Sequence, residues 1–362
     1  MLNYQKLNLM IKEKVKMIDK QTTSNPNSPI EVKVRDIRLD ALKGFLGILV
    51  VAGHVFFAYT PSGESSWVVN FCYSFHMFLF IFISGFLIGN KEHNSKWLWH
   101  RFKRIIIPYL IWTTFSFFWD YKNLSVKKYF STVFLHPAYW YLLVLFLCDC
   151  FLFLIKLISK NTVSEIILSV LFILLFNIFT ILHIGDEVES IKMLAIYFPY
   201  YFAGYFAKKH ELKMPHLLFY FALVLYPLSM ILYDYGNSAH LINCINSLLN
   251  KLNLQDGLRN NIIKISDKLI FPLYNHYLVA ALGCMFWWFI FGKIAKIKIV
   301  TFFSFLGKYT LQMYLLAGYF FHDYFANRLL NECFLCVISI ILVLIISKII
   351  EKNKVLNRIL FG

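Results

Sequence analysis

Long apolar runs constrain this chain more than any other feature of its sequence. Segments of roughly 17 to 25 mostly apolar residues follow one another, and a helix needs about 20 such residues to cross the hydrocarbon of a bilayer. Hydrophobic side chains make up 59% of the 362 residues and aromatic side chains 19%, which is far above the usage of soluble domains. We therefore predict an all-α, polytopic membrane protein with about ten transmembrane helices.

The apolar runs divide the chain into one membrane domain and two flanking pieces. The predicted spans are residues 39–60, 68–89, 102–120, 138–156, 163–184, 191–207, 215–234, 269–292, 303–325 and 331–350. Residues 38–350 are the predicted transmembrane domain, in which 235–268 is the main non-spanning stretch. Residues 1–37 are predicted to be a basic cytoplasmic extension, partly disordered, in which residues 7–18 form an amphipathic helix on the inner leaflet and residues 19–33 are flexible. Residues 351–362 are predicted to be a cytoplasmic tail.

The basic residues indicate an orientation in the membrane. The net charge of +16 is carried mostly by Lys and Arg in short segments between apolar runs, where they orient helices and do not indicate nucleic-acid binding. With a cytoplasmic N-terminus, 25 Lys and Arg fall inside and 8 outside, so both termini are predicted to be cytoplasmic. The seven Cys are scattered and mostly lie in apolar runs, so we predict neither a disulfide nor a metal site.

Three ionisable residues share one face of the first predicted span. Lys43 and His54 are eleven residues apart, which on a helix means about 16 Å of rise and only about 20° from three full turns. Asp40 lies on the same stripe, one turn before Lys43. One interpretation is an Asp40–Lys43 pair, with Lys43 reaching the headgroups, and a histidine bonded to a carbonyl. The other is a functional path, because ionisable groups inside membranes usually face a cavity and His suits acid, base or nucleophile chemistry.

The motifs RLDALKGFLGILVVAGH, FHMFLFIFISGFLIG and WHRFKRIIIPYLIW resemble the membrane-bound acyltransferase 3 family. The resemblance is strongest to the branch that O-acetylates sugars of bacterial surface polysaccharides. The family has a basic residue, usually Arg, ten residues and then His on its first helix; here these are Lys43 and His54. The resemblance implies that His54 and Lys43 are catalytic, with Asp40 in a supporting role. It also implies that the protein resides in the bacterial inner membrane.

The second motif contains candidate acceptor-binding residues. Ser84 and Gly85 match the SGF element of the family, and Phe78 stands where a Pro is usual. Small residues are also the ordinary packing surface of membrane helices, and Gly permits close helix approach. His76 matches the sugar-acetylating branch and is either an acceptor-binding residue or an interfacial histidine. Trp140 resembles the Trp at the start of the fourth span of the family, although an aromatic belt explains it equally.

The third motif contains candidate donor-binding residues. Arg101 and Arg104 are three apart, on one face of the third predicted span. They are either positive-inside anchors or, as the resemblance implies, contacts to the phosphates of the acyl donor, for which forked guanidinium donors are well suited. A His that many relatives carry near the ninth span is replaced here by Ala317 and Gly318.

The resemblance implies an O-acetyltransferase that uses acetyl-CoA as cosubstrate and no metal. The acceptor would be a hydroxyl of a surface saccharide, such as O-antigen or capsule, whether lipid-linked or not. His54 would act as a general base or carry the acetyl group. A flippase or transporter for lipid-linked saccharides would also use a polar stripe, and a polysaccharide polymerase would also have about ten spans. No paired broken helices and no carboxylate pair in 235–268 are evident in the sequence.

Overall fold

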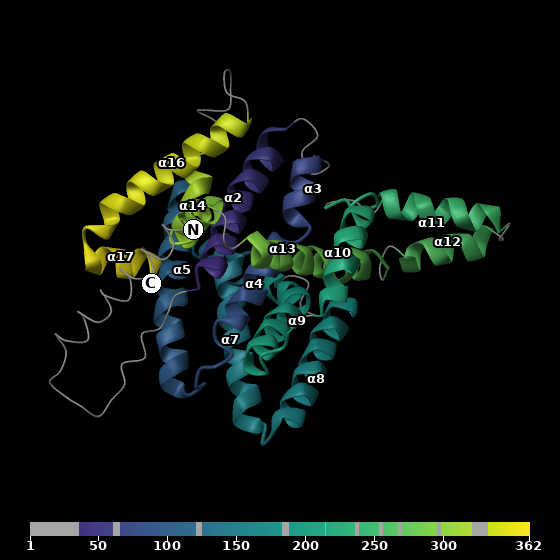
Figure 1. The fold of residues 1–362 in the computed structure, drawn as a ribbon, viewed down its shortest axis with the longest axis horizontal. Coiled ribbons are helices and arrows are strands. Elements are labelled where there is room, and N and C mark those ends of the chain that lie inside the picture. Colours follow the sequence, from purple (N-terminus) through teal and green to yellow (C-terminus); the bar gives the residue numbers. More distant parts are fainter. Residues whose placement is uncertain are drawn as a thin grey trace, which may run out of the picture. The chain divides into compact units, whose positions relative to one another are not determined.

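The computed structural model describes residues 36–60, 66–120, 125–182, 188–213, 215–235, 239–252, 256–266, 270–294, 298–320 and 332–362. Within these ranges every regular element is a helix, as predicted (Figure 1). Residues 37–362 form one compact unit. Most of the predicted N-terminal extension, residues 1–35, lies outside the described residues.

The helices in chain order are α2 (Ile37–Tyr59), α3 (Trp67–Tyr73), α4 (His76–Phe86), α5 (Ser95–Asp120), α6 (Val126–Phe130), η2 (Ser131–Leu135), α7 (Trp140–Ile158), α8 (Thr162–Ile181), α9 (Glu189–Lys209), α10 (His216–Ser229), α11 (Ala239–Lys251), α12 (Asp256–Ile265), η4 (Leu273–Val279), α13 (Ala280–Ile294), α14 (Lys298–Leu306), α15 (Thr310–Leu316), η5 (Ala317–Phe320), α16 (Glu332–Glu351) and α17 (Lys354–Phe361). Of these, η2 and η4 are π-helical and η5 is a 3₁₀ turn.

Helix α2 is central to the packing, because it contacts α3, α4, α13, α14, α15 and α16. Two glycines let it approach the end of α14 closely. A Cβ at Gly44 would lie 1.9 Å from the carbonyl oxygen of Phe303, and a Cβ at Gly307 would lie 1.9 Å from the carbonyl oxygen of Asp40. No side chain fits at that distance from a backbone oxygen. The absence of side chains at Gly44 and Gly307 therefore positions α2 against the α14–α15 junction.

Helices α4 and α9 form a second close pair, again through one glycine on each helix. A Cβ at Gly85 would lie 2.0 Å from the carbonyl oxygen of Tyr201, and one at Gly204 would lie 2.0 Å from that of Phe82. Gly85 thus makes the close helix approach that the sequence predicts for the SGF element. This packing also fixes the positions of Ser84 and Tyr201, whose hydrogen bonds are described below.

The prediction of ten spans is wrong. Six described helices are long and apolar enough to cross a membrane, or seven if α14 and α15, which are bent by 52°, form one span. Helix α10 has 14 residues and is too short. Helix α5 begins with a strongly basic segment, and α9 carries Pro199 and four tyrosines. Counting apolar runs overestimated the spans because polar aromatic rings, Pro and flanking charges lower the mean hydropathy of these helices.

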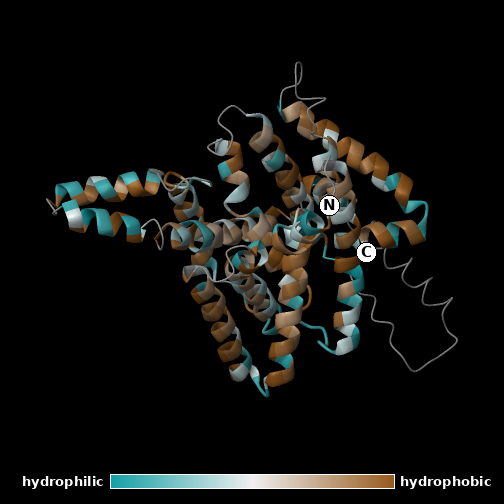
Figure 2. Ribbon diagram, turned by 180° about the vertical axis from the view of Figure 1, so that it is seen from behind, coloured by the Kyte–Doolittle hydropathy of each residue, from teal (hydrophilic) through white to brown (hydrophobic). Residues whose placement is uncertain are grey.

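Apolar side chains cover much of the surface of the candidate spans. Helices α8 and α16 are largely hydrophobic along their length (Figure 2), and residues such as Leu171, Leu174, Ile341 and Ile345 are exposed. Extensive exposed apolar surface of this kind is suited to lipid. By contrast, α11 and α12, which form most of the predicted non-spanning stretch, lie side by side and alternate polar with apolar residues (Figures 1 and 2).

The predicted C-terminal tail contains a helix that packs on the membrane domain. Helix α17 contacts α5 and α16. The indole Nε1 of Trp112 donates a hydrogen bond of 2.8 Å to the carbonyl oxygen of Leu360, and the rings of Trp112 and Phe361 are stacked. The tail therefore supports α5, the helix that carries Arg101 and part of the cavity wall.

Candidate functional site

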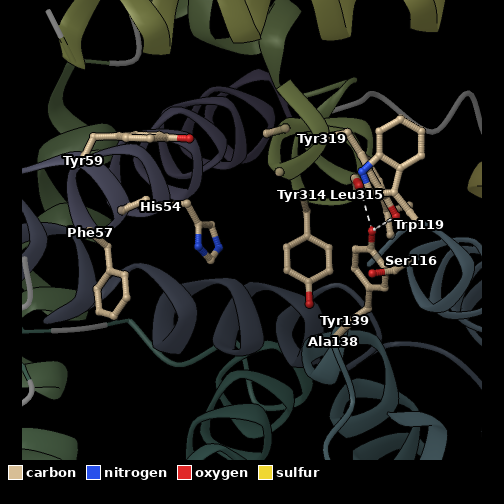
Figure 3. Close-up of a pocket in the computed structure, with 13 residues that line it drawn as sticks. His54, Phe57, Tyr59, Ser116, Trp119, Ala138, Tyr139, Tyr314, Leu315 and Tyr319 are labelled. Atoms are coloured by element: carbon tan, nitrogen blue, oxygen red, sulfur yellow. Dashed lines mark hydrogen bonds between the residues drawn. The ribbon is translucent and has the colours of Figure 1, made fainter. Parts of the chain in front are cut away.

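A cavity of about 480 Å³ opens at the end of α2 where His54 lies (Figure 3). The residues that line it are His54, Phe57, Ala58, Tyr59, Ser116, Trp119, Ala138, Tyr139, Tyr314, Leu315, Ala317, Gly318 and Tyr319. They come from α2, α5, the segment before α7, α15 and η5, so segments far apart in the sequence build one cavity. Its volume falls within the roughly 300–1,000 Å³ usual for small-molecule sites.

His54 is exposed to this cavity and has one neighbour that orients it. The hydroxyl of Tyr73 lies 3.5 Å from Nδ1 of His54, a long hydrogen bond, and the two rings meet edge to face. Because Tyr73 faces Nδ1, the other ring nitrogen, Nε2, is the one available to a reacting group. A histidine oriented through one nitrogen and presented through the other is the arrangement needed for general-base or nucleophilic catalysis.

Tyrosines form the wall of the cavity on the side of α7 and α15. The hydroxyl of Tyr139 lies 2.7 Å from that of Tyr319 and donates to the carbonyl oxygen of Leu315 at 3.2 Å (Figure 3). The hydroxyl of Tyr314 accepts a hydrogen bond from the backbone N–H of Tyr141 at 3.3 Å. These bonds hold the rings in place, so the wall presents preformed aromatic faces and a few fixed hydroxyl groups.

Asp40 and Lys43 form a salt bridge of 2.8 Å on the first turns of α2. The carboxylate is buried, whereas the ammonium is about a quarter exposed. The helix rise puts this pair about 16 Å from His54. The structure therefore shows the Asp40–Lys43 pair that the sequence allowed, and His54 opens into a cavity at the far end of the same helix.

Arg101 and Arg104 differ in their surroundings. Arg101 turns into the protein, where Nε donates to Oδ2 of Asp149 at 2.6 Å and Nη2 donates to Oδ1 at 3.3 Å. Tyr201 also donates its hydroxyl to Oδ1 of Asp149. Arg104 is exposed. A shared helix face therefore does not give the two arginines a shared environment.

The three candidate acceptor-binding residues are engaged in packing and hydrogen bonds. His76 is buried, and its Nδ1 lies 2.5 Å from the carbonyl oxygen of Cys72. Ser84 donates to the carbonyl oxygen of Phe80 at 2.9 Å and lies 3.2 Å from the hydroxyl of Tyr141. Trp140 stacks on Tyr197 with ring centroids 5.0 Å apart. None of the three is among the described residues that line the cavity.

Tyr73 links the two histidines. Its ring contacts both His54 and His76 edge to face, with centroids 6.3 and 5.1 Å apart. The sequence did not point to Tyr73, because α3 ends there and α4 begins only at His76. Proximity across that break depends on how the chain turns, which no periodicity predicts.

A second charged cluster joins the adjoining ends of α7, α8 and α9. Glu165, which is 2% exposed, accepts hydrogen bonds from both Lys156 and Lys209. His93, in the connection between α4 and α5, lies near these charges. Burial, aided by the positive charge of Lys156, lowers the pKa of His93 to about 4. This cluster ties three helices together and keeps His93 neutral near pH 7.

Asp149, the partner of Arg101, was not identified as a candidate residue from the sequence. It lies at the midpoint of α7, between Cys148 and Cys150 in an otherwise apolar helix. An acid at the centre of a span is itself a functional signal, so this residue could have been found. Its pairing with Arg101, which is 48 residues away in the sequence, could not have been predicted. Within the described residues, no group of three or more metal-ligating side chains occurs.

Comparison with known proteins identifies the family. No curated protein and no solved structure matches the chain. The family model described as an acyltransferase domain, that of the acyltransferase 3 family, matches residues 36–348. The match includes α2, the cavity residues and the Arg101–Asp149 pair. With most of its length matched and several helices able to span a membrane, the chain belongs to the acyltransferase 3 family and is a multi-pass membrane acyltransferase.

Proposed function

We propose that this protein transfers an acetyl group from cytoplasmic acetyl-CoA to a hydroxyl of a cell-surface saccharide, with His54 as the catalytic residue. The observation that carries the proposal is that His54, with the hydroxyl of Tyr73 at its Nδ1, lines a preformed aromatic cavity. Sugars bind well on such walls, because aromatic faces stack on their C–H surfaces while fixed hydroxyl groups bond to theirs. His76, Ser84 and Trp140 would then support the acceptor-binding region from behind the cavity.

The donor would enter from the end of α2 that carries Lys43. Coenzyme A carries several phosphate charges, and Lys43, Arg101 and Arg104 are the cations that we assign to them. Asp40 would hold Lys43 in place through its salt bridge. The distance of about 16 Å from Lys43 to His54 along α2 leaves room for the extended pantetheine arm between the phosphates and the thioester.

The simplest chemistry uses His54 as a general base. Nε2 takes the proton of the acceptor hydroxyl while its oxygen attacks the thioester carbonyl. Collapse of the tetrahedral intermediate breaks the C–S bond, and the coenzyme A thiolate leaves and takes the proton from the imidazolium. In the alternative route, Nε2 attacks the thioester first, the C–S bond breaks and the coenzyme A thiolate is released. The hydroxyl then takes the acetyl group from the histidine, and its proton neutralises the thiolate. The products are the same, and a trapped acetyl-histidine would distinguish the two routes.

The proposal places the protein in a bacterial cytoplasmic membrane with both termini in the cytoplasm. Six spanning helices among the described residues, an even number, would return both termini to one side, and the eight Lys and Arg before the first span favour the cytoplasm for that side. A reporter fused at Lys354 should lie in the cytoplasm, and one fused behind Tyr59, after the first span, should lie outside; the pair of fusions tests the orientation. Membership in an acyltransferase family argues against the flippase and polymerase alternatives.

The test compares O-acetyl groups on the surface polysaccharide of wild-type, deletion, His54→Ala and His216→Ala cells by mass spectrometry. His216 is exposed at the start of α10 and serves as the matched control. We expect acetylation to be lost in the deletion and in His54→Ala and retained in His216→Ala. Acetyl esters at wild-type levels in well-expressed His54→Ala protein would exclude the assigned role. Unchanged acetylation but missing or shortened polysaccharide in the deletion would favour transport or polymerisation.

A further inference from the structure

The Arg101–Asp149 pair lies inside the helical domain, not at its surface. Asp149 is completely buried, and the side chain of Arg101 is 21% exposed. The pair joins the centre of α7 to α5, and Tyr201 joins the same carboxylate to α9. Burying two charges at this depth costs free energy that their attraction often fails to recover. Apolar side chains would fill the same space with equal or better stability.

Only part of the hydrogen-bonding capacity of Arg101 is used by Asp149. A guanidinium has five N–H donors, and Asp149 takes one from Nε and one from Nη2. Within the described residues no other hydrogen bond of this guanidinium is recorded, so three donors remain. By contrast, both oxygens of Asp149 are occupied. Arg101 thus presents a guanidinium that is held in a fixed orientation and has N–H donors left over, which suits an anionic ligand.

Arg101 also lies next to the structure that supports the cavity. Its partner Asp149 lies on α7, about two helical turns after Tyr141. The hydroxyl of Tyr141 lies 3.2 Å from that of Ser84, and its backbone N–H donates to Tyr314, which lines the cavity beside His54. An anion held by Arg101 would therefore lie beside α7, the helix whose first turn contacts the wall of the acceptor cavity through Tyr141 and Tyr314.

We propose that Asp149 is a positioning residue, which orients the guanidinium of Arg101 so that its remaining donors bind a phosphate of the acyl donor. Asp149 itself does not touch the substrate. This inference rests on the proposed function and adds to it a residue and a reason for a buried charge pair. Glu165, another buried acid, serves as a comparison. Its two carboxylate oxygens accept hydrogen bonds from Lys156 and Lys209, and among the described residues it holds no guanidinium with unused donors.

The main test is Asp149→Glu, which keeps the negative charge but moves it by one methylene. We expect the KM for acetyl-CoA to rise about tenfold or more, since a displaced charged hydrogen bond is worth at least that factor, while kcat changes less than about threefold. The matched control is Glu165→Asp, the same one-methylene change in the other buried acid, for which we expect an unchanged KM. A wild-type KM in Asp149→Glu would overturn the proposal.

The second test is the double variant Arg101→Leu/Asp149→Leu, which removes both charges together. We expect a melting temperature in detergent no lower than that of the wild type, together with loss of coenzyme A binding in a calorimetric titration. A double variant that fails to fold would show that the pair serves stability, and one that binds coenzyme A normally would show that Arg101 is not a ligand. Either result overturns the proposal.

Coenzyme A binding separates this inference from the proposed function. His54→Ala should bind coenzyme A as tightly as wild type while transferring no acetyl group. If wild-type protein binds coenzyme A but no acetyl transfer to saccharide is found, the acceptor assignment fails and the role of Asp149 is still measured by binding. If Asp149→Glu binds coenzyme A like wild type, the inference fails although the acyltransferase assignment stands.

Discussion

Replacing Gly44 by Ala tests whether backbone contact between α2 and the end of α14 holds the site together. The added Cβ would lie 1.9 Å from the carbonyl oxygen of Phe303 and 2.7 Å from the backbone nitrogen of Gly307. An ordinary contact begins at 3.4 Å, so the two segments must separate by about 1.5 Å at this point. The obstacle is backbone, so no side-chain rotation relieves it.

Two opposing free-energy changes decide the outcome of Gly44→Ala. Ala is favoured over Gly within a helix by about 1 kcal/mol. Overpacking a well-packed interior costs about 1–3 kcal/mol, and a backbone clash belongs at or above the upper end of that range. We therefore expect a net loss of about 2 kcal/mol or more in the free energy of unfolding. For a chain of this size that corresponds to a melting temperature lower by about 2.5 °C or more.

The assay is thermal unfolding of purified protein in detergent, followed by intrinsic tryptophan fluorescence. The control is Gly257→Ala in α12, where a Cβ would meet nothing within 4 Å and helix propensity alone should act. We expect this control to melt at or slightly above the wild-type temperature. A Gly44→Ala protein that melts as high as wild type would refute the close packing of α2 on α14, and with it the basis for the relative placement of His54 and Tyr314.

Three further predictions concern single side chains. Lys43→Arg should retain acetyl transfer within about threefold, since a guanidinium also supplies positive charge beside Asp40; an inactive, folded variant would show that the compact ammonium is required. Tyr314→Phe removes the acceptor for the Tyr141 N–H, and we expect a higher KM for the acceptor with an unchanged KM for acetyl-CoA, in steady-state assays. Because burial lowers the pKa of His93 to about 4, the unfolded chain, with its ordinary pKa near 6.5, binds the proton more readily. The stability that comes from neutral His93 is therefore present above about pH 6.5 and is lost as the pH falls towards 4. His93→Gln should reduce the fall in melting temperature between pH 7 and pH 4.5. An identical fall in the wild type and in the variant would contradict this.

The candidate site could be predicted from the sequence only where its residues belong to one helix. Lys43 and His54 lie on α2, and the helical period alone puts them on one face. The Asp40–Lys43 pair follows from the same local geometry. Ser84 and Gly85 likewise follow from one motif, and the backbone contact at Gly85 is one that small residues commonly make.

The cavity could not be predicted in this way, since its walls are contributed by four separate stretches of the chain. Tyr139, Tyr314 and Tyr319 are ordinary aromatic residues in the sequence, where such residues usually face lipid or fill the core. Arg101 illustrates the same limit. Its motif indicated a helix face shared with Arg104, whereas the structure pairs it with an acid 48 residues away.

Composition and local period were enough to establish a helical membrane protein and the position of His54 on its first span. Both depend on burial of apolar surface and on the regular rise of a helix, which act over a few residues. The cavity before His54 and the Arg101–Asp149 pair depended on tertiary structure. They arise from contacts between helices distant in the chain, such as α5 with α7 and α2 with α15. The side chains that can be accommodated at those contacts depend on the surface of the partner helix, and this surface cannot be read from the sequence of one helix alone.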